Sequence, residues 1–564
     1  MAFLTNLFGG QANGSRDSDN AAEIVENLVE RVETSTVLED RRDALKALRS
    51  LAKKVRLPVA AIGMNAYMEI LEKEYRNSEI IAIVLEILVA VLCDDEAADD
   101  GHDEIGERLA EMIVRKKTFV PSVMALLQSY DFNVRRAVIR LLTALLRHRA
   151  SEVQAAIVQE PTGVSRLLLF DIIDVEPVES IVIEDCLYVI LNLLRRNAKN
   201  QQLFREASMI QRLAALLHCL LYGREGEQGA PRREYEWNRQ KAANVMFLLQ
   251  VVRSLVSPQD NSQGNTHAAQ KVLSQTGVLK NLCNILLSEV GAAVEVLTET
   301  IVAIAEVICG NYPNQEYFST RTIATEIGNR PALIVLLLSL NTDKQPFKLR
   351  CAVFYCFLCF LHDNEFGKTK VIDTLLPSGA SDPDVTTGQC ICSAILSSET
   401  VQVWMGCVCL LHCVLDADHL KQQLLRVQLT TNASEPPSSL LQHLTGLLIS
   451  LGNRRPQTRA GLLMLLSAWL HNCPLAVAQF ISVDENIQYL TMQLDGYGAE
   501  GSEDENRVRR VGKEKLVELL EALSHSEHYV KALQRPQPLA KAPQDLFLDY
   551  QFTKFFKSVE GFQI

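Results

Sequence analysis

The stretch Val134-Arg135-Arg136-Ala137 opens a short apolar run, Val138-Ile139-Arg140-Leu141-Leu142, and this pattern returns along the chain. A basic residue again opens such a run at Lys241, Arg350 and Arg459, and related runs without it start near Ile183, Leu297 and Val403. Successive starts, at residues 134, 183, 240, 297, 349, 403 and 458, are 49 to 57 residues apart. A period of this size is typical of a solenoid, in which each unit buries its apolar face against its neighbours.

Composition supports a helical array. The chain has 564 residues, of which 48% are hydrophobic and 6% aromatic. A single core stops growing near about 250–300 residues, so this length requires several domains or a repeat array. No long run of alternating β-branched residues appears, which predicts an all-α fold. The net charge of −12 argues against nucleic acid as a partner, because phosphate binding needs a basic face.

Fourteen cysteines raise the question of a metal or redox site, and eight of them lie between Cys351 and Cys413. Pairs such as Cys356 and Cys359 sit inside an apolar helical sequence rather than around the polar knuckle of a zinc site. Packing as small hydrophobic side chains is the preferred interpretation, and a metal or redox site the weaker one. We expect no cofactor. Many thiols without a signal peptide favour a reducing cytosol.

The chain divides into four predicted regions. Residues 1–20 are expected to be a flexible leader, with an apolar start that either stays free, docks on the first repeat or forms an interfacial turn of helix. Residues 21–494 form the repeat array, with breaks predicted at 94–103, 223–233, 257–266, 377–388 and 430–438. Residues 495–506 are an acidic linker, and 507–564 a C-terminal helical end that opens with an amphipathic helix over 507–524. No apolar run reaches the roughly 20 residues of a membrane span.

Sequence motifs of catalysis are missing. The chain has no phosphate-binding loop, no His-Glu-x-x-His and no Gly-x-Ser-x-Gly. His525 and His528 lie close together but lack a third ligand, and the acidic stretch Asp94–Asp103 lacks the ligand spacing of a calcium loop. We interpret the histidines as surface residues and the acidic stretch as a solvated loop. The sequence therefore predicts a protein that is not an enzyme.

Within one unit the pattern is specific. Residues 200–213 form a short helix, a corner of small residues and the start of a longer helix, and residues 270–282 repeat this with Gly277 at the corner. Glycine suits such a turn because it adopts positive φ without steric cost. This resembles an armadillo repeat, whose third helix lines the inner face of a superhelix. Asn192 stands where armadillo arrays often place an asparagine on that face; a hydrogen bond at the helix end is an equal alternative.

Several stretches resemble the head of the general vesicular transport factors, the Golgi vesicle-tethering family of the golgin class. They occur in the family's order along nearly the whole chain: residues 1–4 and 9–11, 40–54, 345–353, 422–429, 458–466, 469–474 and 549–554. Two departures stand out. No sustained heptad pattern follows Gln534, so tail functions are not carried over. The array also looks shorter than the family's, with an irregular junction near Phe170 and a curtailed end near Leu494.

The resemblance implies a cytoplasmic homodimer, peripheral on Golgi membranes and ER-Golgi transport vesicles. Its implied partners are a Rab-family small GTPase, the conserved oligomeric Golgi complex, and golgins and SNAREs, the last two mainly through the tail. We therefore expect a tether that docks vesicles before SNARE-mediated fusion. The candidate interaction residues are Asn192, Leu425, Arg426 and Gln428. The main alternative is an armadillo-type adaptor or transport receptor that binds extended peptides in its groove; a signalling or cytoskeletal scaffold also stays open.

Overall fold

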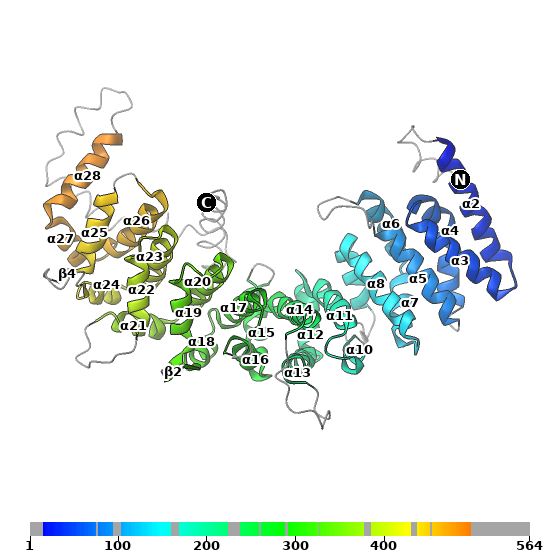
Figure 1. Cartoon of the computed structure of the whole chain (residues 1–564), viewed down its shortest axis with the longest axis horizontal. Coiled ribbons are helices and arrows are strands. Elements are labelled where there is room, and N and C mark those ends of the chain that lie inside the picture. The colour runs from blue at the N-terminus through cyan, green and yellow to red at the C-terminus, as the bar shows by residue number, and fades with distance from the viewer. Residues whose placement is uncertain are drawn as a thin grey trace. The chain divides into compact units, whose positions relative to one another are not determined.

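The computed structural model describes residues 15–74, 77–93, 103–159, 169–223, 237–258, 261–287, 292–325, 328–376, 385–429, 437–451 and 454–497. The chain forms two compact units, Met1–Leu255 and Val256–Ile564, and each is described by itself. In both units nearly all described residues lie in helices that stack side by side (Figure 1). The predicted all-α class is confirmed.

The first unit is wholly helical in its described part. Its elements are α2 (Ser15–Thr34), α3 (Leu38–Ala52), α4 (Arg56–Lys73), α5 (Ser78–Leu92), α6 (Glu104–Arg115), α7 (Phe119–Ala125), the 3-10 turn η1 (Leu126–Gln128), α8 (Phe132–His148), α9 (Ala150–Gln159), α10 (Leu169–Val175), α11 (Ile181–Leu194), α12 (Ala198–Glu206), α13 (Met209–Tyr222) and α14 (Arg239–Val256).

The second unit continues the helical pattern and adds two short hairpins. Its elements are α15 (Gln263–Gln275), α16 (Val278–Leu287), α17 (Val294–Ile308), α18 (Tyr312–Ser319), β1 (Thr322–Thr325), β2 (Gly328–Pro331), α19 (Ala332–Leu340), α20 (Phe347–Leu361), α21 (Glu365–Asp373), α22 (Thr387–Ile395), α23 (Thr400–Val414), α24 (Asp418–Leu424), β3 (Gln428–Leu429), β4 (Ser438–Ser439), α25 (Leu440–Leu451), α26 (Pro456–Leu470), α27 (Pro474–Ile481) and α28 (Asp484–Tyr497). Both pairs are antiparallel, with Thr322 opposite Pro331 and Gln428 opposite Ser439.

The predicted period marks one helix of each repeat, which we call the third helix. The seven predicted starts fall at the beginnings of α8, α11, α14, α17, α20, α23 and α26. Third helices of neighbouring repeats pack on one another, for example α5 on α8 and α23 on α26. These helices are buried on almost every side. In α20, every residue from Ala352 to Leu361 except Tyr355 is buried. This explains why the apolar runs are so continuous.

Sharp corners separate the helices of each repeat. After the third helix one residue adopts a left-handed conformation, with φ between 50° and 64°, at Arg196, Gly310, Asp363, Asp416 and Asn472. An asparagine follows at three of these corners and accepts a hydrogen bond from the backbone N–H three residues on: Asn197, Asn311 and Asn364. The predicted corner at Gly277 is confirmed, with φ of 82° between α15 and α16. These local signals end and restart the helices.

A buried glutamine in the first helix of a repeat binds the end of the third helix of the same repeat. Gln315 Nε2 donates to the carbonyl oxygens of Cys359 and His362, at 3.0 and 2.7 Å. Three other glutamines bind carbonyl groups of the following third helix in the same way: Gln154, Gln201 and Gln270. Because carbonyl groups at a helix end lack intrahelical partners, these amides satisfy them and hold the first and third helices of a repeat together.

Four findings differ from or lie beyond the predictions. The two hairpins were not predicted. The break predicted over 257–266 is too long, because α15 begins at Gln263. Helix α2 begins at Ser15, inside the predicted leader. At the junction near Phe170, α10 spans only seven residues. Residues 1–14, most of the predicted linker and all of 507–564, with His525 and His528, lie outside the described residues.

Candidate interaction surface

Asn192 lies on the third helix α11, partly buried. Its Nδ2 donates to the carbonyl oxygen of Tyr188 at 2.8 Å, one turn back in the same helix. Its own carbonyl oxygen accepts the 2.7 Å hydrogen bond from Gln154 Nε2. The Tyr188 ring packs edge-on against Phe247 of α14, with centroids 5.7 Å apart. The side chain therefore makes the helix-end hydrogen bond that the sequence offered as the alternative to groove recognition.

Leu425, Arg426 and Gln428 lie together on the turn between α24 and β3. Arg426 and Gln428 are exposed and Leu425 is partly exposed. Between them Val427 is buried, and its carbonyl oxygen accepts a hydrogen bond from the Leu440 N–H at 3.0 Å. The β3–β4 hairpin thus anchors the turn to the start of α25. The three predicted residues form one small, firmly held surface in the second unit, whereas Asn192 belongs to the first.

The tryptophans test the peptide-groove alternative, because peptide-binding armadillo grooves rely on accessible tryptophan and asparagine pairs. Trp404 is 3% exposed and Trp469 is 0% exposed. Trp469 Nε1 donates to the carbonyl oxygen of Lys421 at 2.9 Å. Trp237 is half-buried beneath the Lys241 ammonium group, 5.1 Å from the ring centre. Two of the three indoles are core residues and offer no groove contact.

Long-range arginine clamps were missed by the sequence analysis. Arg350 Nε donates to the carbonyl oxygen of Leu340 at 3.1 Å, and its two Nη atoms bind both Glu399 oxygens at 2.9 and 2.8 Å. Glu399 is the residue before α23, so the clamp joins α19, α20 and α23 of two repeats. Arg41 and Arg56 have the same geometry, a carbonyl oxygen for Nε and a carboxylate for the Nη pair.

Asp103 is the carboxylate of the Arg56 clamp, with Oδ2 2.6 Å from Arg56 Nη2. Its Oδ1 also accepts from the Gly106 N–H at 2.9 Å, which caps α6. Burial opposes its charge, but the hydrogen bonds from Arg56 and Gly106 outweigh burial and lower the pKa of Asp103. The prediction of a solvated loop over Asp94–Asp103 is therefore wrong for Asp103.

Exposed apolar side chains gather where α8 and α11 begin. Tyr130 is 103% exposed and Phe132 is 39% exposed at the start of α8. Val175 and Ile181, just before and at the start of α11, are 68% and 48% exposed. Helices α8 and α11 pack side by side within the first unit, so we call these four residues the α8–α11 edge. The sequence analysis missed this edge, because nothing in the local sequence shows whether such apolar residues are buried.

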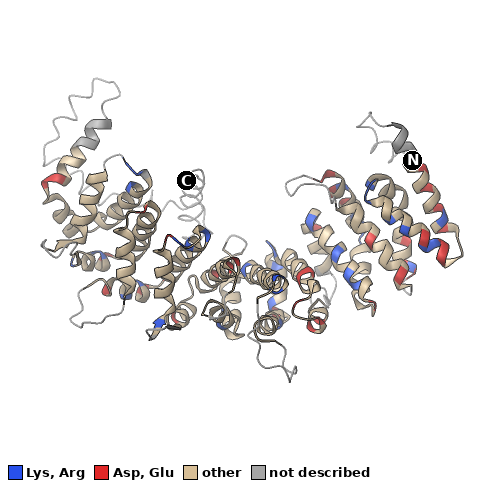
Figure 2. Cartoon of the chain, viewed as in Figure 1, with Lys and Arg blue, Asp and Glu red and all other residues tan. Residues whose placement is uncertain are grey.

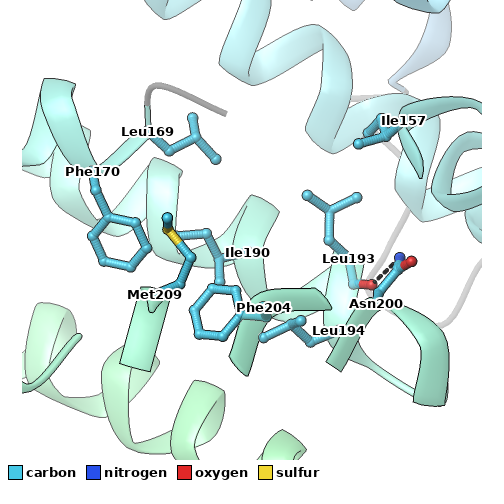
Figure 3. Close-up of a pocket in the computed structure, with 9 residues that line it drawn as sticks. All are labelled: Ile157, Leu169, Phe170, Ile190, Leu193, Leu194, Asn200, Phe204 and Met209. Carbon is cyan, nitrogen blue, oxygen red and sulfur yellow. Dashed lines mark hydrogen bonds between the residues drawn. The ribbon is translucent and has the colours of Figure 1, made fainter. Parts of the chain in front are cut away.

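A small cavity lies at the short helix α10 (Figure 3). Its lining comes from α9 to α13: Ile157, Leu169, Phe170, Ile190, Leu193, Leu194, Asn200, Phe204 and Met209. The one polar side chain among them, Asn200, donates its Nδ2 hydrogen to the Leu193 carbonyl oxygen at 2.8 Å. A lining without acid, base or nucleophile offers no group for catalysis.

The cysteines are core residues, as predicted. Seven of the eight between Cys351 and Cys413 are buried, and Cys351 is partly buried. Burial raises the pKa of Cys390 and of Cys392 to about 11, so both thiols stay protonated at neutral pH. Among the described residues no group of three His, Cys, Asp or Glu side chains could hold a metal ion.

Both signs of charge occur on the described helices. Lys and Arg are interspersed with Asp and Glu in each of the two units (Figure 2). Many are paired, as in the contacts of Arg212 with Asp171 and Asp174 at 2.7 and 2.5 Å. In the described part of the chain, no helix combines the length and the apolar character needed to cross a bilayer.

Comparison with known families identifies relatives along the whole chain. A model of the head region of Uso1/p115-like vesicle tethering proteins matches residues 311–507, and a model of the armadillo tether-repeat of vesicular transport factors matches residues 234–291. The general vesicular transport factors p115 of Bos taurus and Homo sapiens are each 35% identical over 644 aligned residues. Golgin candidate 6 of Arabidopsis thaliana is 23% identical and covers 85% of the chain.

The p115 alignments cover 100% of this chain and 65% of each relative, so the chain spans about two thirds of their length. The relatives are named as transport factors rather than enzymes. Among solved structures, the crystal structures of Uso1-1 and Uso1-2 are similar, with TM-scores of 0.58 and 0.57 and identities of 19% and 18%. They cover 95% and 96% of this chain, and it covers 93% and 90% of theirs. The predicted armadillo-like fold is confirmed.

Proposed function

Because this chain is homologous over its full length to the p115/Uso1 general vesicular transport factors, we propose that it is a vesicle tether. It acts in ER-to-Golgi and intra-Golgi traffic, docks transport vesicles before SNARE-mediated fusion, and works through protein contacts rather than catalysis. The observation that carries this proposal is the 35% identity to p115 over 100% of the chain. It resides in the cytoplasm and binds Golgi membranes and vesicles peripherally, through proteins.

The proposed partners of the repeat array are a Rab-family small GTPase and the conserved oligomeric Golgi complex. Golgins and SNAREs are proposed to bind the tail region of the family. The whole protein is proposed to associate with itself as a homodimer. The turn of Leu425, Arg426 and Gln428 is the proposed contact in the second unit. Its support is structural: two exposed polar side chains and a partly exposed leucine are held on a hairpin, so binding requires little ordering of the backbone.

A pull-down with nucleotide-loaded Rab proteins tests this function. The purified full chain is incubated with immobilised Golgi Rab proteins in the GTP and GDP forms, and with Golgi extract. We expect retention by the GTP form of at least one Rab, together with subunits of the oligomeric Golgi complex. Failure to retain any Golgi Rab, golgin or Golgi complex subunit would contradict the proposed tether function.

A variant pair then tests the proposed contact. Arg426→Glu with Gln428→Ala alters the exposed turn without touching buried Val427, and Lys348→Glu serves as a matched exposed control in the same unit. We expect the double variant alone to reduce retention at least tenfold, with unchanged circular dichroism. Equal retention by both variants would remove the turn from the binding surface and leave the tether function standing.

The adaptor alternative predicts a different result. An extended-peptide receptor binds short peptides with the third helices and needs no nucleotide on any partner. If the chain binds basic peptides as tightly as it binds the whole partner protein, the result would favour the adaptor alternative. The burial of Trp404 and Trp469 weighs against it.

A further inference from the structure

Helix α8 leaves one narrow side uncovered along its length. Between Ala137 and Leu146 only Arg140 and Thr143 are not buried. Partly or fully exposed residues continue this line in both directions at spacings of four residues, which keeps them on one side of the helix. We call this line the arginine stripe: Phe132, Arg136, Arg140, Thr143 and Arg147.

The three arginines of the stripe have no carboxylate partner among the described residues. Within that part of the chain, no hydrogen bond or ion pair joins Arg136, Arg140 or Arg147 to another side chain. The Nε of Arg136 is buried and has no hydrogen-bond acceptor there. Elsewhere in this unit arginines are paired, such as Arg149 with Glu111 at 2.8 Å. The stripe therefore keeps its positive charge available for a ligand.

The stripe does not serve the stability of its own helix. Arg136 and Arg140 are four residues apart, and like charges at this spacing repel across one helical turn. Neutral polar side chains would keep this side of α8 hydrated without that repulsion. A line of like charges that weakens the helix and has no structural partner indicates binding of an anion.

Carboxylates border the stripe on both sides. Helices α5 and α11 pack against α8. The uncovered side of α5 carries Glu86, which is paired with Arg49, and that of α11 carries Asp185. Burial raises the pKa of Asp185, while Arg136 and Arg140 act in the opposite direction because both lie near this carboxylate. The positive charge is thus one helix wide, which fits a narrow ligand better than the broad anionic surface of a membrane.

An apolar end adjoins the line of charge. The stripe begins with Phe132, which is 39% exposed, next to Tyr130, which is 103% exposed. On α11 the matching first residue, Ile181, is 48% exposed. All three belong to the α8–α11 edge. A ligand that fits this surface therefore has carboxylates along its length and an apolar group at one end.

The geometry favours a helical ligand. A rise of 1.5 Å per residue places Phe132 about 22 Å from Arg147 along α8. A second helix laid along the stripe repeats the same spacings, so its carboxylates meet the arginines in register. An extended peptide would need side-chain amides for its backbone groups, but the amide of Asn192 on neighbouring α11 donates to Tyr188 of its own helix. A helix pairs its own backbone groups and needs no such amide.

We propose that the arginine stripe binds an acidic amphipathic helix of a partner protein, with carboxylates on Arg136, Arg140 and Arg147 and an apolar residue on the α8–α11 edge. The surface belongs to the first unit, whereas the contact proposed above for the tether lies in the second. The two proposals use different residues and different probes, so failure of either leaves the other standing.

Synthetic helical peptides of about 18 residues, long enough to cover the stripe, test this surface. One carries a leucine at its N-terminal end and glutamates at the spacings of the three arginines, with alanine and glutamine elsewhere. The other has the reverse order, because a partner helix can run in either direction. We expect one of them to bind the full chain saturably in fluorescence anisotropy. Binding should weaken as salt is raised, because salt screens exposed charge pairs.

Charge reversal locates the binding site. Arg136→Glu with Arg140→Glu and Arg147→Glu should weaken peptide binding at least about tenfold. Glutamine at the same three positions should give a smaller loss with unchanged circular dichroism, which guards against misfolding of α8. The matched control has the same net charge as the glutamate variant and should bind as the wild type does. It places glutamate at three exposed lysines of the same unit: Lys53, Lys117 and Lys199.

A second variant pair tests the apolar end. Tyr130→Ser with Phe132→Ser should weaken binding at least about threefold, because the leucine of the peptide loses apolar contact. Val37→Ser with Leu38→Ser is the control, since both residues are 52% exposed at the start of α3 in the same unit. It should leave the affinity unchanged.

Four results would overturn the proposal. They are no binding of either helical peptide, an equal loss in the lysine control, and equal binding of a peptide with the same charges in which prolines prevent a helix. The fourth is binding of phosphatidylserine vesicles that the arginine substitutions abolish while both peptides stay unbound, which would assign the stripe to a membrane surface.

Discussion

Replacing Arg350 by methionine should destabilise the second unit at the junction of two repeats. Methionine keeps most of the side-chain volume but removes three hydrogen bonds, one to the Leu340 carbonyl and two to the Glu399 carboxylate. The Arg350 side chain is 5% exposed, and Glu399 is 34% exposed. Breaking a buried ion pair costs about 3–5 kcal/mol. Because Glu399 can regain some hydration, we expect a loss of about 2–4 kcal/mol in the free energy of unfolding.

Urea unfolding followed by circular dichroism measures this loss, and hydrogen exchange locates it in α19, α20 and the start of α23. Lys348→Met is the control, because it removes a positive charge from an exposed position in the same helix. Glu399→Gln and the double variant complete a cycle in which the coupling energy should be about 1–3 kcal/mol. A loss for Arg350→Met no greater than that for Lys348→Met would refute the clamp as a stabilising contact.

Two further predictions concern single side chains. Gln315→Leu removes two hydrogen bonds to helix-end carbonyls, so the free energy of unfolding should fall by about 1–3 kcal/mol, whereas exposed Glu316→Ala should leave the urea midpoint unchanged. Burial lowers the pKa of His412 to about 4, below its unfolded value of about 6.5, so the unfolded state binds the proton first as pH falls. Stability should therefore drop by about 2 kcal/mol from pH 7 to 5, and His412→Gln should remove this part of the pH dependence measured by urea titration; an unchanged slope would contradict it.

The repeat starts could be predicted because their signal is local. A third helix is buried almost all round, so its sequence is an unbroken apolar run that needs no partner to be recognised. The corner at Gly277 is equally local, since its φ of 82° favours glycine whatever surrounds it. These features fix the fold class and the number of residues between repeats.

Contacts between residues far apart in the sequence could not be predicted in this way. Gln315 is separated from His362 by 47 residues, and Arg350 from Glu399 by 49. The sequence marks Arg350 as the start of an apolar run but does not name Glu399 as its partner, and Gln315 has no such mark. Asp103 was misread for the same reason: the acidic sequence before it predicts a solvated loop, but its partner, Arg56, lies 47 residues away.

The candidate interaction residues stay a prediction. Arg426 and Gln428 are exposed, as a contact requires, whereas the Asn192 amide donates to the Tyr188 carbonyl oxygen of its own helix. The α8–α11 edge escaped notice because exposure of an apolar residue depends on the neighbouring repeat, not on its own segment. Tyr130 and Phe132 are aromatic residues of the kind found in cores, yet both are exposed.

The basic residue that opens the third helices has no single structural role. Arg350 binds a carbonyl and a carboxylate of other segments, whereas Lys241 is 2% exposed and lies over the Trp237 ring. What these residues share is a charge buried where two repeats meet. A buried charge requires a partner, and the partners of Arg350 and Lys241 differ. The repeats therefore share the same helices but differ in the polar contacts that join them. The sequence period therefore marks where repeats join, and the strength of each joint must be measured individually.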